Sequence, residues 1–360
     1  LVYNVERVME ECLAIKPDLV FLWDEAWFAF ARSGPTYRKR TGMATANRLR
    51  DKFKSDAYRE TYEAFTKEVD LSDDAACMEN RLMPDPAKAR VRVYVTQSTH
   101  KTLTSLRQGS MLHVNDQDFR SKVEDSLHEA YMTHTSTSPN YQIVASLDVG
   151  RRQVELEGFE LVSKQVEMAM VLREQIQTNP LLRHFRFLTV KDLIPEEYRA
   201  SGIESYYDPE HGWTSFFEAW SDDEFVLDAT RLTLYVGSTG LDGDTFKNEQ
   251  LMDKYGIQIN KTSRNTVLFM TNIGTTRSSV AYLIEVLVKI AQEMDEQLDT
   301  LSRPELRARD KRIKSLTVDL PSLPDFSRFH DFFRSDPSSP TPEGRIRDAY
   351  FLAYDEDACD

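Results

Sequence analysis

Two adjacent acidic residues, Asp24 and Glu25, directly follow the apolar run LVFLW. Such a run is typical of a buried strand, and open α/β sheets bind their ligands where the strands end. A carboxylate in a buried place is costly unless a cation or a hydrogen-bond donor pairs with it. The pair is therefore either part of a binding site or an exposed strand end without a functional role.

Lys101 follows a second strand-like pattern, the alternating residues 91–95. Ser98, Thr99 and His100 precede it, so hydroxyls, an imidazole and an amine meet where this strand ends. A lysine in such a place is a solvated point charge, a clamp for phosphate, or an amine that bonds covalently to a carbonyl group. Its residue type and neighbours leave these three roles open.

Together, the acid and the lysine meet the needs of one cofactor, pyridoxal phosphate. This cofactor needs a lysine amine for its aldehyde and a carboxylate that keeps its pyridine nitrogen protonated. Hydroxyls and backbone N–H groups at a strand-to-helix turn can hold its phosphate. Asp24, Ser98 and Lys101 supply these groups, with the acid first along the chain.

The surrounding sequence changes character near residue 155. Before it, strand-like and helix-like stretches alternate, which predicts an α/β domain at 1–155 with a mostly parallel sheet. After it, more strands and a long amphipathic stretch predict a smaller α+β domain at 156–360, which ends in proline-containing loops. Strands are expected at 19–27, 89–95, 109–114, 231–237, 256–260 and 266–274, and helices at 5–16, 44–69, 117–131, 152–178 and 278–298.

The composition narrows the class of protein. Of the 360 residues, 41% are hydrophobic and 29% charged, as in soluble globular proteins. No apolar run reaches the roughly 18 residues of a membrane-spanning helix, and no signal peptide opens the chain. The net charge of −14 argues against nucleic acid or an anionic membrane as partner. Three scattered cysteines favour the reducing cytoplasm, and neither they nor the seven histidines show a metal-binding spacing.

Four segments, DEAW, TQSTHK, QGSMLHV and HTSTSPNYQIVAS, carry a resemblance to a known family. Together they resemble the bacterial ornithine/lysine/arginine decarboxylases, which are fold type I pyridoxal phosphate enzymes. The clear match covers residues 19–150, and FVLDATRLTL with the later strands resembles the family's carboxy-terminal domain. The resemblance implies part of a fold type I large domain, followed by the smaller α+β domain.

The resemblance also implies roles for the residues around the cofactor. Lys101 would bond to the cofactor aldehyde and Asp24 would pair with the pyridinium nitrogen. Ser98 and His100 would lie against the phosphate, and His100 would share the catalytic role of Lys101 and Asp24. No metal is implied.

Other implied roles concern the rim of the site and a second subunit. Ala26 and Trp27 would flank the ring or the mouth of the pocket. Thr135 and Ser136 would contact the phosphate of the partner subunit, because sites of this kind form at the interface of a homodimer. Since acidic residues outnumber basic ones by 59 to 45, we expect such dimers to associate further as the pH falls.

The implied reaction is the decarboxylation of a basic amino acid to carbon dioxide and an amine. Arginine, lysine and ornithine stay open as substrates, with agmatine, cadaverine or putrescine as the product. Two alternatives also stay open: another fold type I activity, such as that of an aminotransferase, and a non-catalytic dimerisation or regulatory homologue.

The chain departs from the family pattern in two respects. Arg107 and Gly109 stand where the family usually has Ser and Ala, which predicts a local difference in the lysine-bearing loop. Only 23 residues precede Asp24, so the family's upstream phosphate-binding loop and ring-stacking histidine are not in this chain. We therefore expect a carboxy-terminal fragment, inactive alone, whose strand at 19–27 lacks a neighbour and exposes apolar side chains.

Overall fold

The computed structural model describes residues 1–213, 216–319, 341–342 and 344–346. The chain forms two compact units, Leu1–Leu301 and Ser302–Asp360. In the second unit, helix α14 (Arg303–Thr317) begins with a capping box formed by Ser302 and Glu305. Most of the predicted proline-containing loops, and Cys359, lie outside the described residues. The predicted site residues all belong to the first unit.

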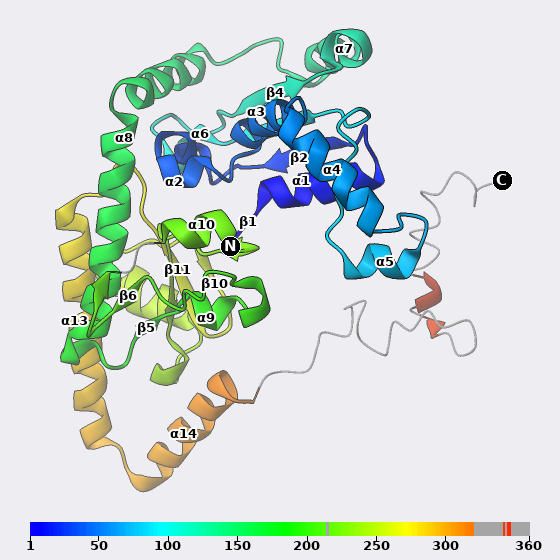
Figure 1. Cartoon of the computed structure of the whole chain (residues 1–360). Helices are drawn as coiled ribbons and strands as arrows, with labels where there is room; N and C mark the ends of the chain where they lie inside the picture. The colour runs from blue at the N-terminus through cyan, green and yellow to red at the C-terminus, as the bar shows by residue number, and fades with distance from the viewer. Residues whose placement is uncertain (214–215, 320–340, 343, 347–360) are drawn as a thin grey trace. The chain divides into compact units, whose positions relative to one another are not determined.

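A three-stranded sheet in the order β2-β3-β4 carries the predicted site (Figure 1). β2 (Val20–Asp24) and β3 (Arg92–Gln97) are parallel, with Asp24 opposite Thr96. β4 (Met111–Asp116) is antiparallel to β3. Only one of the two strand pairings is therefore parallel, so the mostly parallel sheet is not confirmed in the described part of the chain.

One face of this sheet packs against helices. Helices α1 (Val5–Ile15) and α3 (Gly42–Lys52) contribute Met9 and Leu49 to a core that also contains Val93 of β3. The predicted helix at 5–16 is confirmed by α1. The apolar side chains of α1 recur at helical spacing and so meet the sheet from one side.

The opposite face of the sheet is open in the part of the chain that the structure describes. Leu22 is 69% exposed and Leu112 is 51% exposed, and both lie on the face that carries Asp24. Among the described strands β2 pairs with β3 alone, so it forms an edge. The interpretation of 19–27 as a strand buried on both faces is therefore wrong here, whereas the expected exposed apolar edge is confirmed.

The segment between β2 and β3 is helical, but it is not one helix. α3 ends before Ser55, whose hydroxyl accepts a hydrogen bond from Tyr58 N and starts α4 (Asp56–Glu68). The single helix predicted over 44–69 is therefore two. The other helical segments up to residue 134 are η1 (Ala29–Ser33), α2 (Pro35–Arg38), α5 (Asp74–Glu79), α6 (Thr99–Thr102), the π-helical η2 (Phe119–Val123) and α7 (Glu124–His134).

The long helix α8 (Tyr141–Thr178) leads from this sheet to a second, antiparallel sheet with the strand order β10-β11-β9-β5. The last turns of α8 and helix α13 (Arg277–Thr300) enclose the core of this sheet. The predicted helix at 278–298 is confirmed, and the helix predicted from 152 begins earlier, at Tyr141. The boundary predicted at 155–156 falls inside α8 and stays a prediction.

The strands and helices whose bounds have not yet been given are β1 and those between α8 and α13. The strand predicted at 256–260 is wrong: Gly256 adopts a φ of 65° and ends α12, and the next strand in the chain is β10. The bounds are β1 (Val2–Tyr3), β5 (Arg186–Phe187), β6 (Tyr207–Asp208), β7 (Gly212–Trp213), β8 (Phe225–Val226), β9 (Arg231–Tyr235), β10 (Lys261–Thr262), β11 (Thr266–Met270), η3 (Pro180–Leu182), α9 (Val190–Leu193), η4 (Glu196–Tyr198), α10 (Phe217–Asp222), η5 (Gly237–Thr239), α11 (Gly243–Thr245), η6 (Phe246–Met252) and α12 (Asp253–Tyr255).

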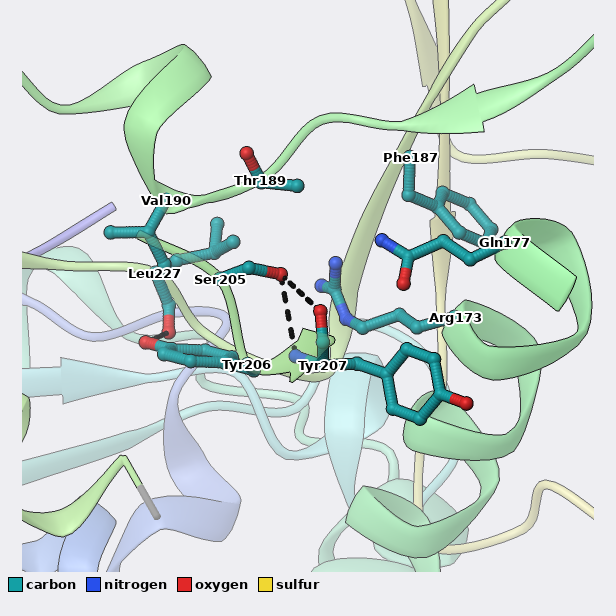
Figure 2. Close-up of a pocket in the computed structure, with 9 residues that line it drawn as sticks. All are labelled: Arg173, Gln177, Phe187, Thr189, Val190, Ser205, Tyr206, Tyr207 and Leu227. Atoms are coloured by element: carbon teal, nitrogen blue, oxygen red, sulfur yellow. Dashed lines mark hydrogen bonds between the residues drawn. The ribbon is translucent and has the colours of Figure 1, made fainter. Parts of the chain in front are cut away.

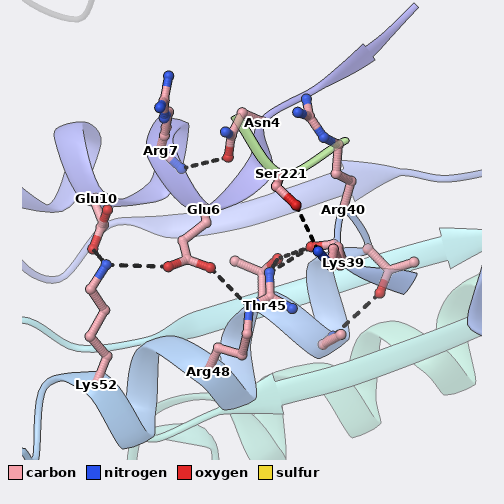
Figure 3. A network of polar contacts seen from close by, with 12 residues as sticks. Asn4, Glu6, Arg7, Glu10, Lys39, Arg40, Thr45, Arg48, Lys52 and Ser221 are labelled. Carbon is pink, nitrogen blue, oxygen red and sulfur yellow. Dashed lines mark hydrogen bonds and ion pairs between the residues drawn. The ribbon is translucent and has the colours of Figure 1, made fainter. Parts of the chain in front are cut away.

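Arg40, which lies between α2 and α3, links this region of the unit to α10 by hydrogen bonds. Its guanidinium is buried and donates hydrogen bonds to the carbonyls of Ala219, Trp220, Asp223 and Glu224 at the end of that helix. Burial lowers the pKa of Arg40 to about 10. Next to it, acidic side chains of α1 form ion pairs with basic side chains of α3 (Figure 3).

None of the helices in the described ranges is long and apolar enough to cross a membrane.

Candidate functional site

The candidate site lies where β2 and β3 end. Because these strands are parallel, both ends meet at the same edge of the sheet. Their hydrogen bonding continues beyond the strands: Glu25 N donates to Thr96 O at 2.9 Å, and Ser98 N donates to Ala26 O at 3.3 Å. The segments DEAW and STHK, which are far apart in the sequence, therefore lie side by side.

Lys101 is held next to an aromatic ring. It lies on the short helix α6, which Ser98 precedes as N-cap, where the sequence had predicted a loop. Its amine nitrogen Nζ is 5.8 Å from the centre of the Trp27 ring, within the range of a cation–π contact. Lys101 is only partly buried, so a small molecule can reach the amine.

Asp24 presents its carboxylate on the open face of the sheet. Its Oδ1 accepts a hydrogen bond from Ala26 N at 2.9 Å, which orients the side chain in the turn after β2. The residue is exposed, so its charge is solvated and it needs no cationic partner within the chain. Asp24 is thus fixed in direction and accessible.

The buried carboxylate of the pair is Glu25, which is only 7% exposed. Its Oε1 accepts from Gly42 N at 2.6 Å and its Oε2 accepts from Gln97 Nε2 at 2.8 Å. Burial raises the pKa of Glu25, while these two hydrogen bonds oppose the change. The other end of the Gln97 amide, Oε1, lies 3.1 Å from His113 Nε2, and burial lowers the pKa of that imidazole. The network joins residues of β3 and β4 and the residue that follows β2 to the start of α3.

The raised pKa of Glu25 makes a prediction about stability. The folded protein keeps the Glu25 proton at pH values where the unfolded chain has released it, starting near the ordinary value of 4.5. The contribution of this group to stability is therefore full below that pH and is lost as the pH rises through the folded-state pKa. We expect the difference in free energy of unfolding, wild type minus Glu25→Gln, to fall as the pH rises from 4.5. Urea denaturation of both proteins across this range measures it, and a difference independent of pH would contradict the assignment.

His100 and the loop after α6 are held together by one carbonyl. Nδ1 of His100 is 3.2 Å from Gly109 O, and Thr99 Oγ1 donates to the same oxygen at 3.4 Å. Gln108 has a φ of 74°, in the left-handed region. A Cβ on Gly109 would lie 2.6 Å from a methyl carbon of Leu147. The lysine-bearing loop is therefore tightly turned at the positions where the sequence departs from the family.

Thr135 and Ser136 lie in the exposed loop between α7 and α8. Thr135 Oγ1 donates to Tyr131 O at 2.6 Å, and Ser136 Oγ accepts from Ser138 N at 3.1 Å. These local bonds shape the loop, and no described contact connects it to Lys101 of the same chain. Their role in the site of a partner subunit stays a prediction.

Arg231, at the start of β9, is a site neighbour that the sequence analysis missed. Its guanidinium donates a hydrogen bond to Trp27 O and lies 5.2 Å from the centre of the Trp27 ring. Asp228 Oδ2 lies 3.6 Å from its Nε. Trp27 therefore contacts both Arg231 and Lys101. No local signal could have shown this, because Arg231 and Trp27 are 204 residues apart in sequence.

A separate pocket lies beside the second half of α8 (Figure 2). Arg173 points its guanidinium toward β9, where it donates to the carbonyls of Ala229 and Arg231. These bonds give Arg173 a structural role. None of the predicted site residues lines this pocket, which is formed by Arg173, Gln177, Phe187, Thr189, Val190, Ser205, Tyr206, Tyr207 and Leu227.

An accessible lysine and an accessible carboxylate at the ends of parallel strands are the kinds of group that a carbonyl cofactor requires. Residues 56–279, more than half of the chain, match the family model described as Orn/Lys/Arg decarboxylase, major domain. The chain belongs to this family. Lys101 lies within the matched residues, and Asp24 precedes them.

Several relatives are similar over much of this chain. The constitutive lysine decarboxylase of Escherichia coli is 29% identical over 254 residues, which are 68% of this chain and 32% of the relative. A lysine decarboxylase of Pseudomonas aeruginosa is 25% identical over 84% of this chain and 36% of the relative. The constitutive ornithine decarboxylase of E. coli is 26% identical over 73% of this chain and 38% of the relative. The chain thus spans about a third of the length of these relatives.

Solved structures support the same fold. The structure of lysine decarboxylase A from P. aeruginosa matches with a TM-score of 0.54 and 21% identity, covering 89% of this chain and 42% of that one. The structure of the E. coli constitutive lysine decarboxylase matches with a TM-score of 0.51 and 22% identity, covering 81% of this chain and 35% of that one. The decarboxylase fold implied by the sequence is therefore supported.

Proposed function

We propose that this protein takes part in the pyridoxal phosphate-dependent decarboxylation of a basic amino acid, arginine, lysine or ornithine, in the cytoplasm. The observation that carries the proposal is the pairing of the DEAW and STHK segments, which brings the Asp24 carboxylate and the Lys101 amine to one edge of the sheet. Membership of the Orn/Lys/Arg decarboxylase family supports it. The named activities of the relatives, lysine and ornithine decarboxylation, suggest the substrates.

The groups at this edge fit pyridoxal phosphate. Lys101 supplies a reachable primary amine, Asp24 an oriented carboxylate, and Ser98 a hydroxyl at the turn into α6. His100 is already held in place by Gly109 O. When bound, pyridoxal phosphate supplies an electron-accepting ring that stabilises the charge left by departing carbon dioxide.

The side chains of this chain have distinct tasks in the proposal. Lys101 would hold the cofactor through its aldehyde group, because its amine is the reachable nucleophile at this edge of the sheet. Asp24 would face the ring nitrogen, where its negative charge would favour the protonated ring. Ala26 and Trp27 limit the movement of the ring, and Trp27 is itself held by Arg231.

The proposal also assigns residues to the phosphate and to a partner. Ser98 and His100 bind the phosphate within one subunit. Thr135 and Ser136 reach the site of the second subunit of a homodimer, which fits their exposed loop with only local hydrogen bonds. No hydrogen bond within the described residues prevents this loop from contacting another chain.

The activity is tested by measuring carbon dioxide and amine from lysine, ornithine and arginine with added pyridoxal phosphate, in the longest natural form of the protein. We expect equal amounts of both products from one or more of these substrates. A 2-oxo acid without carbon dioxide would indicate an aminotransferase. Cofactor binding without any product would indicate a non-catalytic homologue, and either result would contradict the proposal.

The same assay makes a prediction for residues 1–360 alone. We expect no turnover near that of a full-length relative, because the sheet face around Asp24 is open and β2 is an edge. An open site leaves the reacting groups solvated and poorly oriented, and orientation supplies a large share of catalysis. Turnover of 1–360 at the rate of a full-length relative would show that the open face does not limit the reaction.

A further inference from the structure

The pocket beside the second half of α8 contains a buried positive charge whose hydrogen bonding is incomplete. Arg173 is only 5% exposed, and its Nη2 donates to Ala229 O at 3.3 Å and to Arg231 O at 2.8 Å. Its Nε is buried and has no hydrogen-bond partner among the described residues. A guanidinium stays charged at any ordinary pH, and a buried donor without an acceptor costs free energy. The described part of the chain therefore leaves this donor without the acceptor it needs.

The charge of Arg173 also lacks a carboxylate of its own, since none of the ion pairs between described residues includes it. Asp228 is the acidic residue whose charge reaches Arg173. However, Asp228 Oδ1 accepts hydrogen bonds from Thr230, and its Oδ2 lies 3.6 Å from Arg231 Nε. Burial lowers the pKa of Arg173, the direction expected for a cation that is short of counter-charge. Two largely buried guanidinium groups thus share one carboxylate, which leaves one positive charge unbalanced.

The other polar side chains of the pocket offer few free donors. The hydroxyls of Ser205, Tyr206 and Thr189 each donate to an acceptor within the chain. Gln177 is exposed, and none of the hydrogen bonds between described residues includes its side chain. Figure 2 shows the Gln177 amide next to the Arg173 guanidinium. Among the described lining residues, these two side chains therefore supply the free donors.

We propose that this pocket binds a small monovalent anion of the size of chloride, held by the Arg173 guanidinium and the Gln177 amide. The cavity volume is about 10 Å³, close to the least that holds one water molecule. A single atom fits such a space, whereas a tetrahedral phosphate or sulfate does not. A bound anion balances the guanidinium charge, which a water molecule cannot do. The site is separate from the proposed function, because none of the predicted site residues lines the pocket.

The line width of the chloride-35 NMR signal tests the site directly, because chloride that exchanges with a protein site relaxes faster than free chloride. The sample is the longest natural form of the protein in sodium chloride, without pyridoxal phosphate. We expect an excess line width that added bromide removes, since bromide is a competing anion of similar size. The same concentration of gluconate, a bulky monovalent anion, should leave the excess width unchanged.

Gln177→Glu is the decisive variant, because it places a carboxylate beside Arg173 within the chain. This built-in charge should exclude the anion and reduce the excess line width roughly tenfold. In gluconate, the variant should melt about 3 °C above the wild type, which reaches a similar temperature only when chloride is added. The melting temperature of the variant should no longer depend on chloride.

Gln297→Glu is the matched control. It makes the same exchange at an exposed position in the last turn of another long helix, α13, as Gln177→Glu does in the last turn of α8. It should broaden the chloride signal like the wild type and gain no stability. Arg173→Gln removes the charge itself and should lose the excess width. Should that buried variant fail to fold, the two glutamate variants, both at exposed positions, still decide the question.

Two results would overturn the inference. A wild-type protein without any chloride broadening that bromide removes would show that the pocket holds water only. Equal broadening by Gln177→Glu and Gln297→Glu would place the anion elsewhere on the protein. Neither result bears on the proposed function, which is tested by product formation from basic amino acids.

Discussion

Replacing Lys101 with alanine should abolish covalent capture of pyridoxal phosphate by borohydride reduction, and with it all turnover. Lys101 is the lysine that lies beside Trp27, just after the end of β3. The segment that carries Lys101 is hydrogen-bonded there to the segment that carries Asp24. The site then has no amine for the cofactor aldehyde, and a covalent catalyst without its nucleophile has no route to the reaction. Reduction, digestion and peptide mapping should find the label of the wild-type protein on Lys101.

The control is an exposed lysine on another element of the fold. Lys164, on the outer side of α8, is suitable, and Lys164→Ala should label like the wild type. The assignment fails if the wild-type label is found mainly on another lysine, or if Lys101→Ala labels to the same extent. Both results are read from peptide mass spectra of the labelled proteins and do not require an active enzyme.

Replacing Asp24 with asparagine should leave the cofactor bound but reduce turnover by roughly 100-fold, the usual effect of removing one charge-stabilising group from an active site. The amide oxygen of asparagine can still accept the hydrogen bond from Ala26 N, so the turn after β2 should keep its shape. The change removes the negative charge and little else. Absorbance of the bound cofactor and carbon dioxide release, in the form of the protein that turns over, measure the two effects.

Glu25→Gln is the matched control for Asp24→Asn, because it removes the neighbouring charge. Glu25 faces Gly42 and Gln97 on the covered side of the sheet, so its loss should affect stability more than turnover. Near-normal turnover of the Asp24 variant would exclude Asp24 from the site. A large loss in the Glu25 variant alone would assign the catalytic carboxylate to Glu25 instead.

Much of the candidate site could be predicted from local sequence. The apolar run before Asp24 and the alternating residues before Lys101 place both groups at strand ends, because strand patterns depend on neighbouring residues only. The helix at 278–298 is predicted for the same reason, since its apolar positions repeat at helical spacing. The family, too, is recognisable in segments that are each continuous in the chain.

Other features depend on which elements lie opposite one another, and these only the tertiary structure decided. In the sequence, Asp24 and Glu25 are equally good candidates for the carboxylate of the site. In the folded chain, α3 covers Glu25 and leaves Asp24 open. Burial of a strand face is set by the partner that packs on it, so the apolar residues of β2 could not show that one face is uncovered.

The contact of Arg231 with Trp27 also required the tertiary structure. It joins a strand of the second sheet to the turn after β2, across a separation at which sequence carries no periodic signal. Local sequence thus determined which residues could do chemistry, whereas folding decided which of them are accessible and what holds them in place.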